Sequence, residues 1–290
     1  MQVHQLCESL HISEDEKSQF KREGYIGPCD FLDKKTLEVL FRRCHANLPN
    51  ALLANPLARH IAVRKMVDLA SHPVFMRKLA ALVGNDILLW GSQIIKQQPG
   101  KKKRFHVDAE YSAISGPAIW LAVKNVVPQN TFFVITKSHL INRSPQELQK
   151  LQGINLEDAD EVLVAARQFD PECELVKVDI RDGQFIIFDG KLWHGAANNT
   201  NEARLAMNFR YTTPDQFVRI SKDGELPDVQ WLEKRPYCVT VAGQDRYQVN
   251  KTIDKRKISY VRSFLKGCLY YLPKHTLQKS FKKLKKFTSA

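Results

Sequence analysis

Short runs of β-branched and aromatic residues, separated by Gly, Pro and Asn, recur along the chain between residues 87 and 211. Such runs are typical of strands, because branched and aromatic side chains pack well on a pleated surface, whereas Gly, Pro and Asn favour turns. The pattern predicts strands over residues 87–98, 117–127, 131–137, 184–189 and 203–211. We therefore expect a mainly β core over about residues 85–212.

Helical patterns precede this core. Ser13 and Glu16 have the spacing of a capping box, and Gly24 is a natural stop for the helix that follows. Asp33 is placed to cap a second helix, with apolar residues from Leu37 onward on one face. Further helices are expected near residues 60–70 and 74–82. We expect these helices to support the β core from outside.

Residues 140–174 interrupt the succession of strands and read as an insertion. Ser144, Pro145 and Glu147 form a well-marked helix start, and a second helix is expected within residues 157–169. Insertions of this kind often lie over the mouth of a site and influence substrate choice. Residues 213–250 are turn-rich and suggest no regular element. We place one domain at residues 1–250 and a separate tail at residues 251–290.

Composition places the chain among ordinary globular proteins, with 43% hydrophobic residues in 290. The six cysteines form no Cys-x-x-Cys pair, which favours reduced thiols in a cytoplasmic protein. Met1 to Cys7 contain neither a basic segment nor an apolar core, so we expect no signal peptide. The sequence also has no run of about 18 apolar residues, the length that would indicate a membrane span.

The net charge of +13 is concentrated in the tail, because residues 251–290 contain 12 Lys or Arg and one acidic residue. An apolar stripe at helical spacing accompanies these lysines: Ile258, Val261, Leu265, Cys268, Leu272, Leu277, Phe281 and Leu284. Basic amphipathic helices bind anionic membrane surfaces. We therefore expect peripheral association with the inner face of the cell membrane. The alternative is a helix that packs on the core and leaves its lysines in solvent.

His106, Asp108 and His194 form a candidate iron site. If His106 and Asp108 lie at the end of a strand, alternation points both side chains to the same side. Two imidazoles and one carboxylate on one face of Fe(II) leave three positions open for a co-substrate and O₂. Chance alone supplies roughly one His-x-Asp/Glu in a chain of this composition, and a lone buried histidine is usually structural. We interpret His139 in that structural sense.

The residues around this site resemble the phytanoyl-CoA dioxygenase family of Fe(II)/2-oxoglutarate oxygenases over about residues 13–212. The similarity includes residues 20–25, the His106-Val-Asp108 pair, Trp120, Ser138-His139, and His194 followed by Arg204. The resemblance implies a double-stranded β-helix, or jelly-roll, fold. It also implies that His106, Asp108 and His194 bind iron and that Arg204 pairs with the far carboxylate of 2-oxoglutarate, a task suited to a planar guanidinium.

Two positions refine this resemblance. Family members often carry a Lys two residues before the Pro that precedes the histidine-aspartate pair, whereas Gln97 stands two residues before Pro99 here, with Lys96 beside it. That Lys makes a second contact with the co-substrate, and Gln97 is the candidate for this contact here. Halogenating relatives replace the motif carboxylate with a small residue. Because Asp108 is present, we expect hydroxylation or a related oxidation.

The candidate substrate contacts are Arg104, Tyr111, Asn208 and Arg210. Strand alternation favours Arg104 on the side of His106, and the basic run 101–104 could equally be a solvated loop. Arg210 could approach substrate or reach solvent at its strand end.

The basic tail and basic loop suggest an anionic, membrane-borne substrate. Among relatives of this kind the chain looks most like the hydroxylases of Kdo, the 3-deoxy-manno-octulosonic acid sugar of the lipopolysaccharide inner core. One alternative is a tailoring hydroxylase of a carrier-bound or small metabolite. A second is a non-catalytic module that binds membranes or nucleic acid through its tail, although we expect no nucleic-acid partner.

Overall fold

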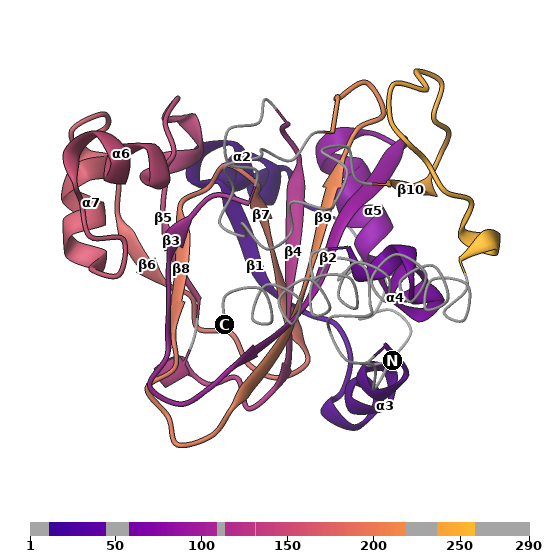
Figure 1. Cartoon of the computed structure of the whole chain (residues 1–290), viewed down its shortest axis with the longest axis horizontal. Helices are drawn as coiled ribbons and strands as arrows, with labels where there is room; N and C mark the ends of the chain where they lie inside the picture. The colour runs from indigo at the N-terminus through magenta and orange to yellow at the C-terminus, as the bar shows by residue number, and fades with distance from the viewer. Residues whose placement is uncertain (1–11, 45–57, 109–113, 131, 219–236, 259–290) are drawn as a thin grey trace, which may run out of the picture.

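Two antiparallel sheets form the body of the protein in the computed structural model, which describes residues 12–44, 58–108, 114–130, 132–218 and 237–258 (Figure 1). The six-stranded sheet has the order β1-β7-β4-β9-β2-β10, and the four-stranded sheet has the order β3-β8-β5-β6. The strands are β1 (Tyr25–Asp30), β2 (Ile87–Gln97), β3 (Lys102–His106), β4 (Pro117–Lys124), β5 (Phe132–Ile135), β6 (Leu175–Lys177), β7 (Gln184–Asp189), β8 (His194–Ala197), β9 (Arg204–Thr212) and β10 (Val239–Ala242). The expected jelly-roll class is confirmed.

The central strands β4, β7 and β9 of the larger sheet are buried on both faces. On β4, Trp120 packs in a cluster between the two sheets with Phe132 of β5 and Phe188 of β7. The neighbouring Ile119 and Leu121 point the other way and join the larger cluster beneath the helices. Strand alternation thus separates an inner face, which faces the second sheet, from an outer face covered by helices.

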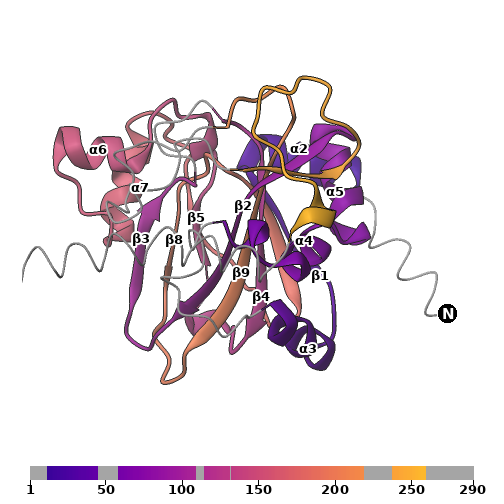
Figure 2. The same ribbon diagram turned by 45° about the vertical axis from the view of Figure 1, so that its right-hand side comes forward.

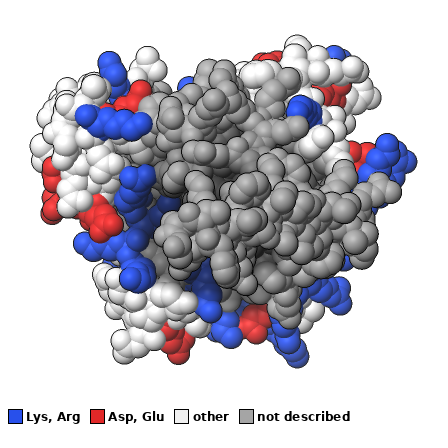
Figure 3. All heavy atoms as spheres, in the orientation of Figure 1, with Lys and Arg blue, Asp and Glu red and all other residues white. Residues whose placement is uncertain are grey.

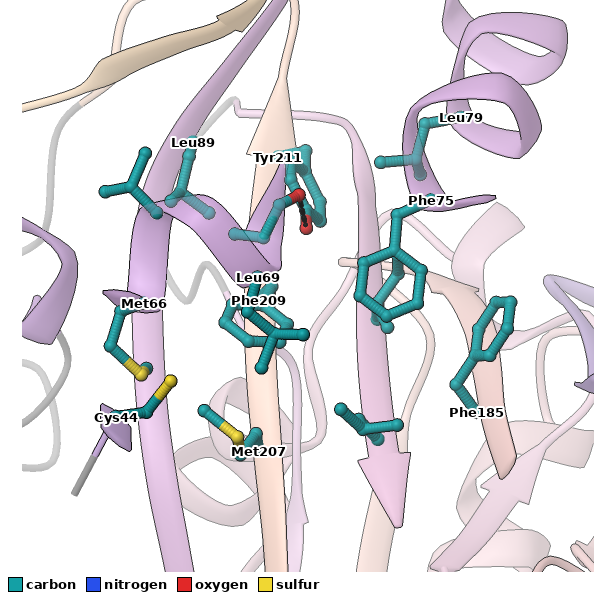
Figure 4. Packing of buried hydrophobic residues seen from close by; sticks show 14 of the residues in the cluster. Cys44, Met66, Leu69, Phe75, Leu79, Leu89, Phe185, Met207, Phe209 and Tyr211 are labelled. Atoms are coloured by element: carbon teal, nitrogen blue, oxygen red, sulfur yellow. Dashed lines mark hydrogen bonds between the residues drawn. The ribbon is translucent and has the colours of Figure 1, made fainter. Parts of the chain in front are cut away.

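The N-terminal helices cover that outer face, as expected, and Figure 4 shows their apolar side chains against the strands. Phe75 stacks on Phe31 with ring centroids 4.5 Å apart and meets Phe185 of β7 edge-on at 5.0 Å. The helical elements here are α2 (Glu14–Glu23), α3 (Lys34–Cys44), the 3₁₀ turn η1 (Arg59–Ile61), α4 (Arg64–Ala70) and α5 (Pro73–Val83). Within the described residues, no helix is long and apolar enough to cross a bilayer.

Helix boundaries follow the sequence signals closely. Both sides of the capping box at Ser13 and Glu16 are formed, and Gly24 ends α2 in the left-handed conformation with φ 85°. The Asp33 carboxylate accepts a hydrogen bond from the Thr36 amide at 3.0 Å, as an N-cap residue does. Ser144 forms the second complete capping box, at the start of α6 (Pro145–Gln152).

The inserted helices α6 and α7 (Ala159–Arg167) lie beside the smaller sheet in both ribbon views (Figures 1 and 2). Their apolar residues form a separate cluster with Phe105 of β3, Ile135 of β5 and Trp193, which immediately precedes β8. Because Phe105 and Trp193 alternate with His106 and His194, the helices back the sheet on the side away from the histidines. These two helices therefore pack behind the smaller sheet and not on the face that carries the histidines.

The C-terminal part of the domain differs from expectation in two ways. Residues 213–250 contain β10, which pairs with β2. Residues 251–258 also belong to the packed domain, because Ile258 is 7% exposed within the large core cluster and the Cys238 amide donates to the Lys251 carbonyl at 2.7 Å. The tail boundary expected at residue 251 is thus too early. The remaining basic stripe, residues 259–290, lies outside the described residues.

Candidate metal centre

His106, at the end of β3, lies directly opposite His194, at the start of β8. The two imidazole rings have their centroids 4.2 Å apart, and His194 Nε2 lies 3.8 Å from Asp108 Oδ1. One potential ligand atom from each of His106, Asp108 and His194 lies within 4.8 Å of the other two. The fold therefore brings together all three side chains that the sequence pattern selected.

Backbone hydrogen bonds orient both imidazoles for metal binding. His106 Nδ1 lies 2.9 Å from the Arg104 carbonyl, and His194 Nδ1 lies 2.8 Å from the Leu192 carbonyl. A carbonyl can only accept, so each Nδ1 carries the proton and each Nε2 keeps its lone pair for a metal. Burial lowers the pKa of both histidines, and the positive charge of a protonated His194 would lower the pKa of His106 further. Both rings are therefore neutral near pH 7, as metal ligands must be.

Packing restricts the ring of His194 from two sides. Phe132 stacks on it with centroids 5.1 Å apart, and Phe188 meets it edge-on at 4.8 Å. The insertion braces the histidine-aspartate motif from behind, because the buried Gln146 of α6 accepts a hydrogen bond from the Val107 amide at 3.3 Å. No local sequence signal identifies Gln146 as a supporting residue, since its partner is 39 positions away.

Two side chains of β9 hold the Asp108 carboxylate. Arg210 Nη2 donates to Oδ1 at 2.6 Å, and Asn208 Nδ2 donates to Oδ2 at 3.2 Å. Burial alone would raise the pKa of Asp108, but the Arg210 guanidinium outweighs it and holds this pKa well below its usual range. Arg210 is only 7% exposed, so the alternative in which it reaches solvent at the strand end is wrong. Both residues thus lie at the metal centre.

Arg204 lies deeper on the same face of β9 and has a different environment. It is 1% exposed, its guanidinium carbon lies 5.1 Å from the centre of the Trp120 ring, and it donates to Gln97 Oε1 and to the Asn130 carbonyl. Burial lowers the pKa of Arg204 to about 10, which leaves it charged. These acceptors are neutral, and Arg204 Nε has no hydrogen-bond partner. A buried guanidinium whose charge is not balanced by a carboxylate is suited to bind the carboxylate of an incoming ligand.

Arg104 does not share the face of His106. The pairing of β3 with β8 shifts by one residue between Lys103 and His106. Because of this bulge, the side chain that shares the face of His106 is that of Lys103 and not that of Arg104. The Arg104 side chain instead donates to Gln149 of α6 at 3.3 Å. Strand alternation without this bulge placed Arg104 on the wrong face of β3. Tyr111 lies outside the described residues.

His139 is structural, as expected. Its Nε2 lies 3.1 Å from the Lys21 carbonyl at the end of α2, and the ring contacts Gly24, where an added Cβ would lie 2.5 Å from Nδ1. The side chain therefore fixes the junction between α2 and β1. Within the described part of the chain, the clusters of potential metal ligands include His106, Asp108 and His194 but not His139.

Comparison with known families agrees with this geometry. Residues 20–206 match the family described as phytanoyl-CoA dioxygenase (PhyH), which is more than half of the chain. The chain belongs to the phytanoyl-CoA dioxygenase family. It is accordingly a non-haem iron enzyme that uses 2-oxoglutarate, and its histidine-aspartate-histidine cluster supplies the ligand set that such an enzyme needs. No curated protein matches the chain significantly.

Solved structures share the fold of this phytanoyl-CoA dioxygenase relative at low sequence identity. The non-heme monooxygenase ThoJ in its apo form has a TM-score of 0.60 at 15% identity, with 91% of this chain and 100% of ThoJ covered. CytC3 with Fe(II) and alpha-ketoglutarate has a TM-score of 0.58 at 15% identity, with 87% and 97% covered. The epimerase SnoN has a TM-score of 0.53 at 18% identity, with 69% and 83% covered.

Proposed function

We propose that this oxygenase hydroxylates an anionic substrate at the cytoplasmic face of the membrane, with the Kdo sugar of the lipopolysaccharide inner core as the leading candidate. The observation that carries the proposal is the charge of the site. Among the described residues there, Arg204, Arg210 and the exposed Lys103 oppose the single carboxylate of Asp108. Because Fe(II) and the 2-oxoglutarate dianion cancel each other's charge, this positive excess favours a substrate with carboxylates or phosphates.

The residues have separate tasks in this function. Bound iron and 2-oxoglutarate supply the oxidising power for attack on a C–H bond with O₂. His106 and His194 would hold the metal through Nε2, and Arg204 would hold the far carboxylate of 2-oxoglutarate. Asp108 would complete the ligand set, which supports hydroxylation over halogenation because no coordination position is freed for a halide.

The surface supports contact with an anionic membrane. Lys and Arg side chains gather around the position of β3 on the face drawn in Figure 3. Lys101, Lys102 and Lys103, which lie just before and at the start of β3, are all exposed. The sequence of the tail adds further positive charge, with eight Lys or Arg and no acidic residue in residues 259–290. Each basic residue near an anionic surface contributes about 1 kcal/mol to binding.

Succinate formation from 2-oxoglutarate under Fe(II) tests the proposal, for wild type and His106→Ala, with and without a Kdo-bearing lipid A precursor. We expect turnover stimulated by the lipid and lost in the variant. Turnover without lipid stimulation would retain the oxygenase and favour a tailoring hydroxylase of a small or carrier-bound metabolite. No turnover in any condition would favour the non-catalytic binding module.

Deletion of residues 259–290 tests the membrane contact separately, and it spares Ile258 and the packed core. The truncated protein should lose sedimentation with vesicles that contain anionic lipid and should lose lipid stimulation of turnover. A charge-swap variant with Lys282, Lys283, Lys285 and Lys286 all changed to Glu controls for lost apolar surface. Unchanged vesicle binding in both variants would refute a role of the tail at the membrane.

A further inference from the structure

Gln97 and Arg204 form a buried cross-strand pair where β2 ends and β9 begins. They are 7% and 1% exposed, respectively, and lie directly opposite each other in the register of the two strands. The neighbouring Lys96 is exposed and belongs to the other face of β2, so it does not reach Arg204. Gln97 is thus the β2 side chain that contacts the guanidinium.

The hydrogen bonds of Gln97 determine which end of its amide meets Arg204. Gln97 Nε2 donates to the Lys101 carbonyl at 2.7 Å and to the Ala196 carbonyl at 3.4 Å. The reverse orientation would place the amide oxygen against two carbonyl oxygens and its N–H groups against a guanidinium. Oε1 therefore faces Arg204 and accepts from Nη2.

The backbone around Gln97 is held as well. Asn198 Nδ2 donates to the Gln97 carbonyl at 3.0 Å and to the Glu202 carbonyl at 2.8 Å, which ties the end of β2 to the turn before β9. On the other side of the guanidinium, Nη1 donates to the Asn130 carbonyl. Neutral oxygens from two directions thus fix the guanidinium of Arg204.

We propose that Gln97 is a positioning residue that orients Arg204 for 2-oxoglutarate and leaves its charge uncompensated, and that it does not itself donate to the co-substrate. Both amide N–H groups already donate to backbone carbonyls, whereas a carboxylate would need a free donor. A neutral acceptor can align a guanidinium without cancelling its charge, which a carboxylate at the same position would do. The inference rests on the proposed role of Arg204 in binding 2-oxoglutarate.

Isothermal titration of 2-oxoglutarate into the Ni(II)-loaded protein tests this role with Gln97→Glu and Gln97→Met, at a series of pH values. At neutral pH the Glu side chain should neutralise Arg204 and raise the Kd for 2-oxoglutarate by on the order of tenfold or more. Lowering the pH should bring the Kd back toward wild type, because a protonated Glu is neutral again, offers its carbonyl oxygen to Arg204 and donates its one O–H to a backbone carbonyl. Met should weaken binding less than Glu, because it leaves the charge of Arg204 free.

Turnover provides a second readout. In Gln97→Glu the KM for 2-oxoglutarate should rise while kcat at saturating 2-oxoglutarate stays near wild type, and the affinity for Ni(II) should not change. Melting temperatures of both variants confirm that they fold. Equal losses of 2-oxoglutarate affinity in the Glu and Met variants would show that Gln97 donates directly, and this would overturn the inference.

Arg204→Met separates the inference from the function on which it rests. If Arg204→Met loses 2-oxoglutarate binding while Gln97→Glu binds as wild type at every pH, the positioning role is overturned and the proposed role of Arg204 stands. If Arg204→Met binds 2-oxoglutarate normally, the proposed role of Arg204 itself fails.

Discussion

The ion pair between Arg210 and Asp108 yields a quantitative prediction about stability and metal binding. Arg210 Nη2 and Asp108 Oδ1 are 2.6 Å apart, and their side chains are 8% and 1% exposed. The guanidinium carbon of Arg210 lies 5.8 Å from the centre of the Trp90 ring, and Arg210→Met keeps an apolar stem of similar length there but removes the charge. Loss of one partner from a buried ion pair costs about 3–5 kcal/mol, because the other charge is left unpaired.

The loss should be visible in the melting temperature of the metal-free protein. Because 1 kcal/mol shifts the Tm of domains of about 150–250 residues by about 2–4 °C, the variant should melt roughly 6–20 °C below wild type. A divalent metal bound at His106, Asp108 and His194 would supply the missing positive charge. The thermodynamic cycle then requires a larger metal-induced rise in Tm for the variant than for wild type.

Differential scanning calorimetry in EDTA and in saturating Ni(II) measures both effects. Arg256→Met is a matched control, because Arg256 also lies 2.6 Å from a carboxylate, that of Asp254, but its side chain is 82% exposed. We expect no resolvable change in Tm for this control, since exposed ion pairs contribute little.

Two results would refute the reasoning about Arg210. One is a metal-free Arg210→Met that melts within about 2 °C of wild type, which would mean that the pair is too weak to follow the range for buried ion pairs. The other is an equal loss of Tm with and without Ni(II). An equal loss would assign the effect to the packing of Arg210 on Trp90 and not to its charge.

Three further predictions concern other buried side chains. Arg204→Lys keeps the charge but not the planar fork, so the KM for 2-oxoglutarate should rise by on the order of tenfold, and an unchanged KM in steady-state assays would contradict the pairing. Burial lowers the pKa of His60 from 6.5 to about 4, so the free energy of unfolding should fall by up to about 3 kcal/mol as the pH drops from 6.5 toward 4. In urea titrations at a series of pH values, the free energy of unfolding of His60→Gln should fall less steeply over this range than that of wild type. Equal slopes for the two proteins would exclude His60 as the cause. Phe75→Ala should lower the free energy of unfolding by about 3–5 kcal/mol without changing the Kd for Ni(II) in the folded state, and a change in that Kd would show that the helical cluster shapes the metal centre.

Much of the local structure and the ligand set could be read from the sequence. Ser13 and Ser144 begin helices because their side chains cap nearby amides within three residues, and such contacts do not depend on the rest of the fold. His106, Asp108 and His194 could be selected because few residue types bind Fe(II), and because the family pattern fixes their spacing. The strands of the core could be predicted for the same local reason.

The tertiary structure alone decided the partners of these residues. A one-residue bulge in β3 places Lys103 rather than Arg104 beside His106, and a bulge depends on how two distant strands pair. Gln97 turns its oxygen to Arg204 because the Lys101 and Ala196 carbonyls take its N–H groups. Arg210 is committed to Asp108, 102 positions away. Such contacts are set by register and packing between elements remote in sequence, which hydrophobic pattern and residue spacing do not encode.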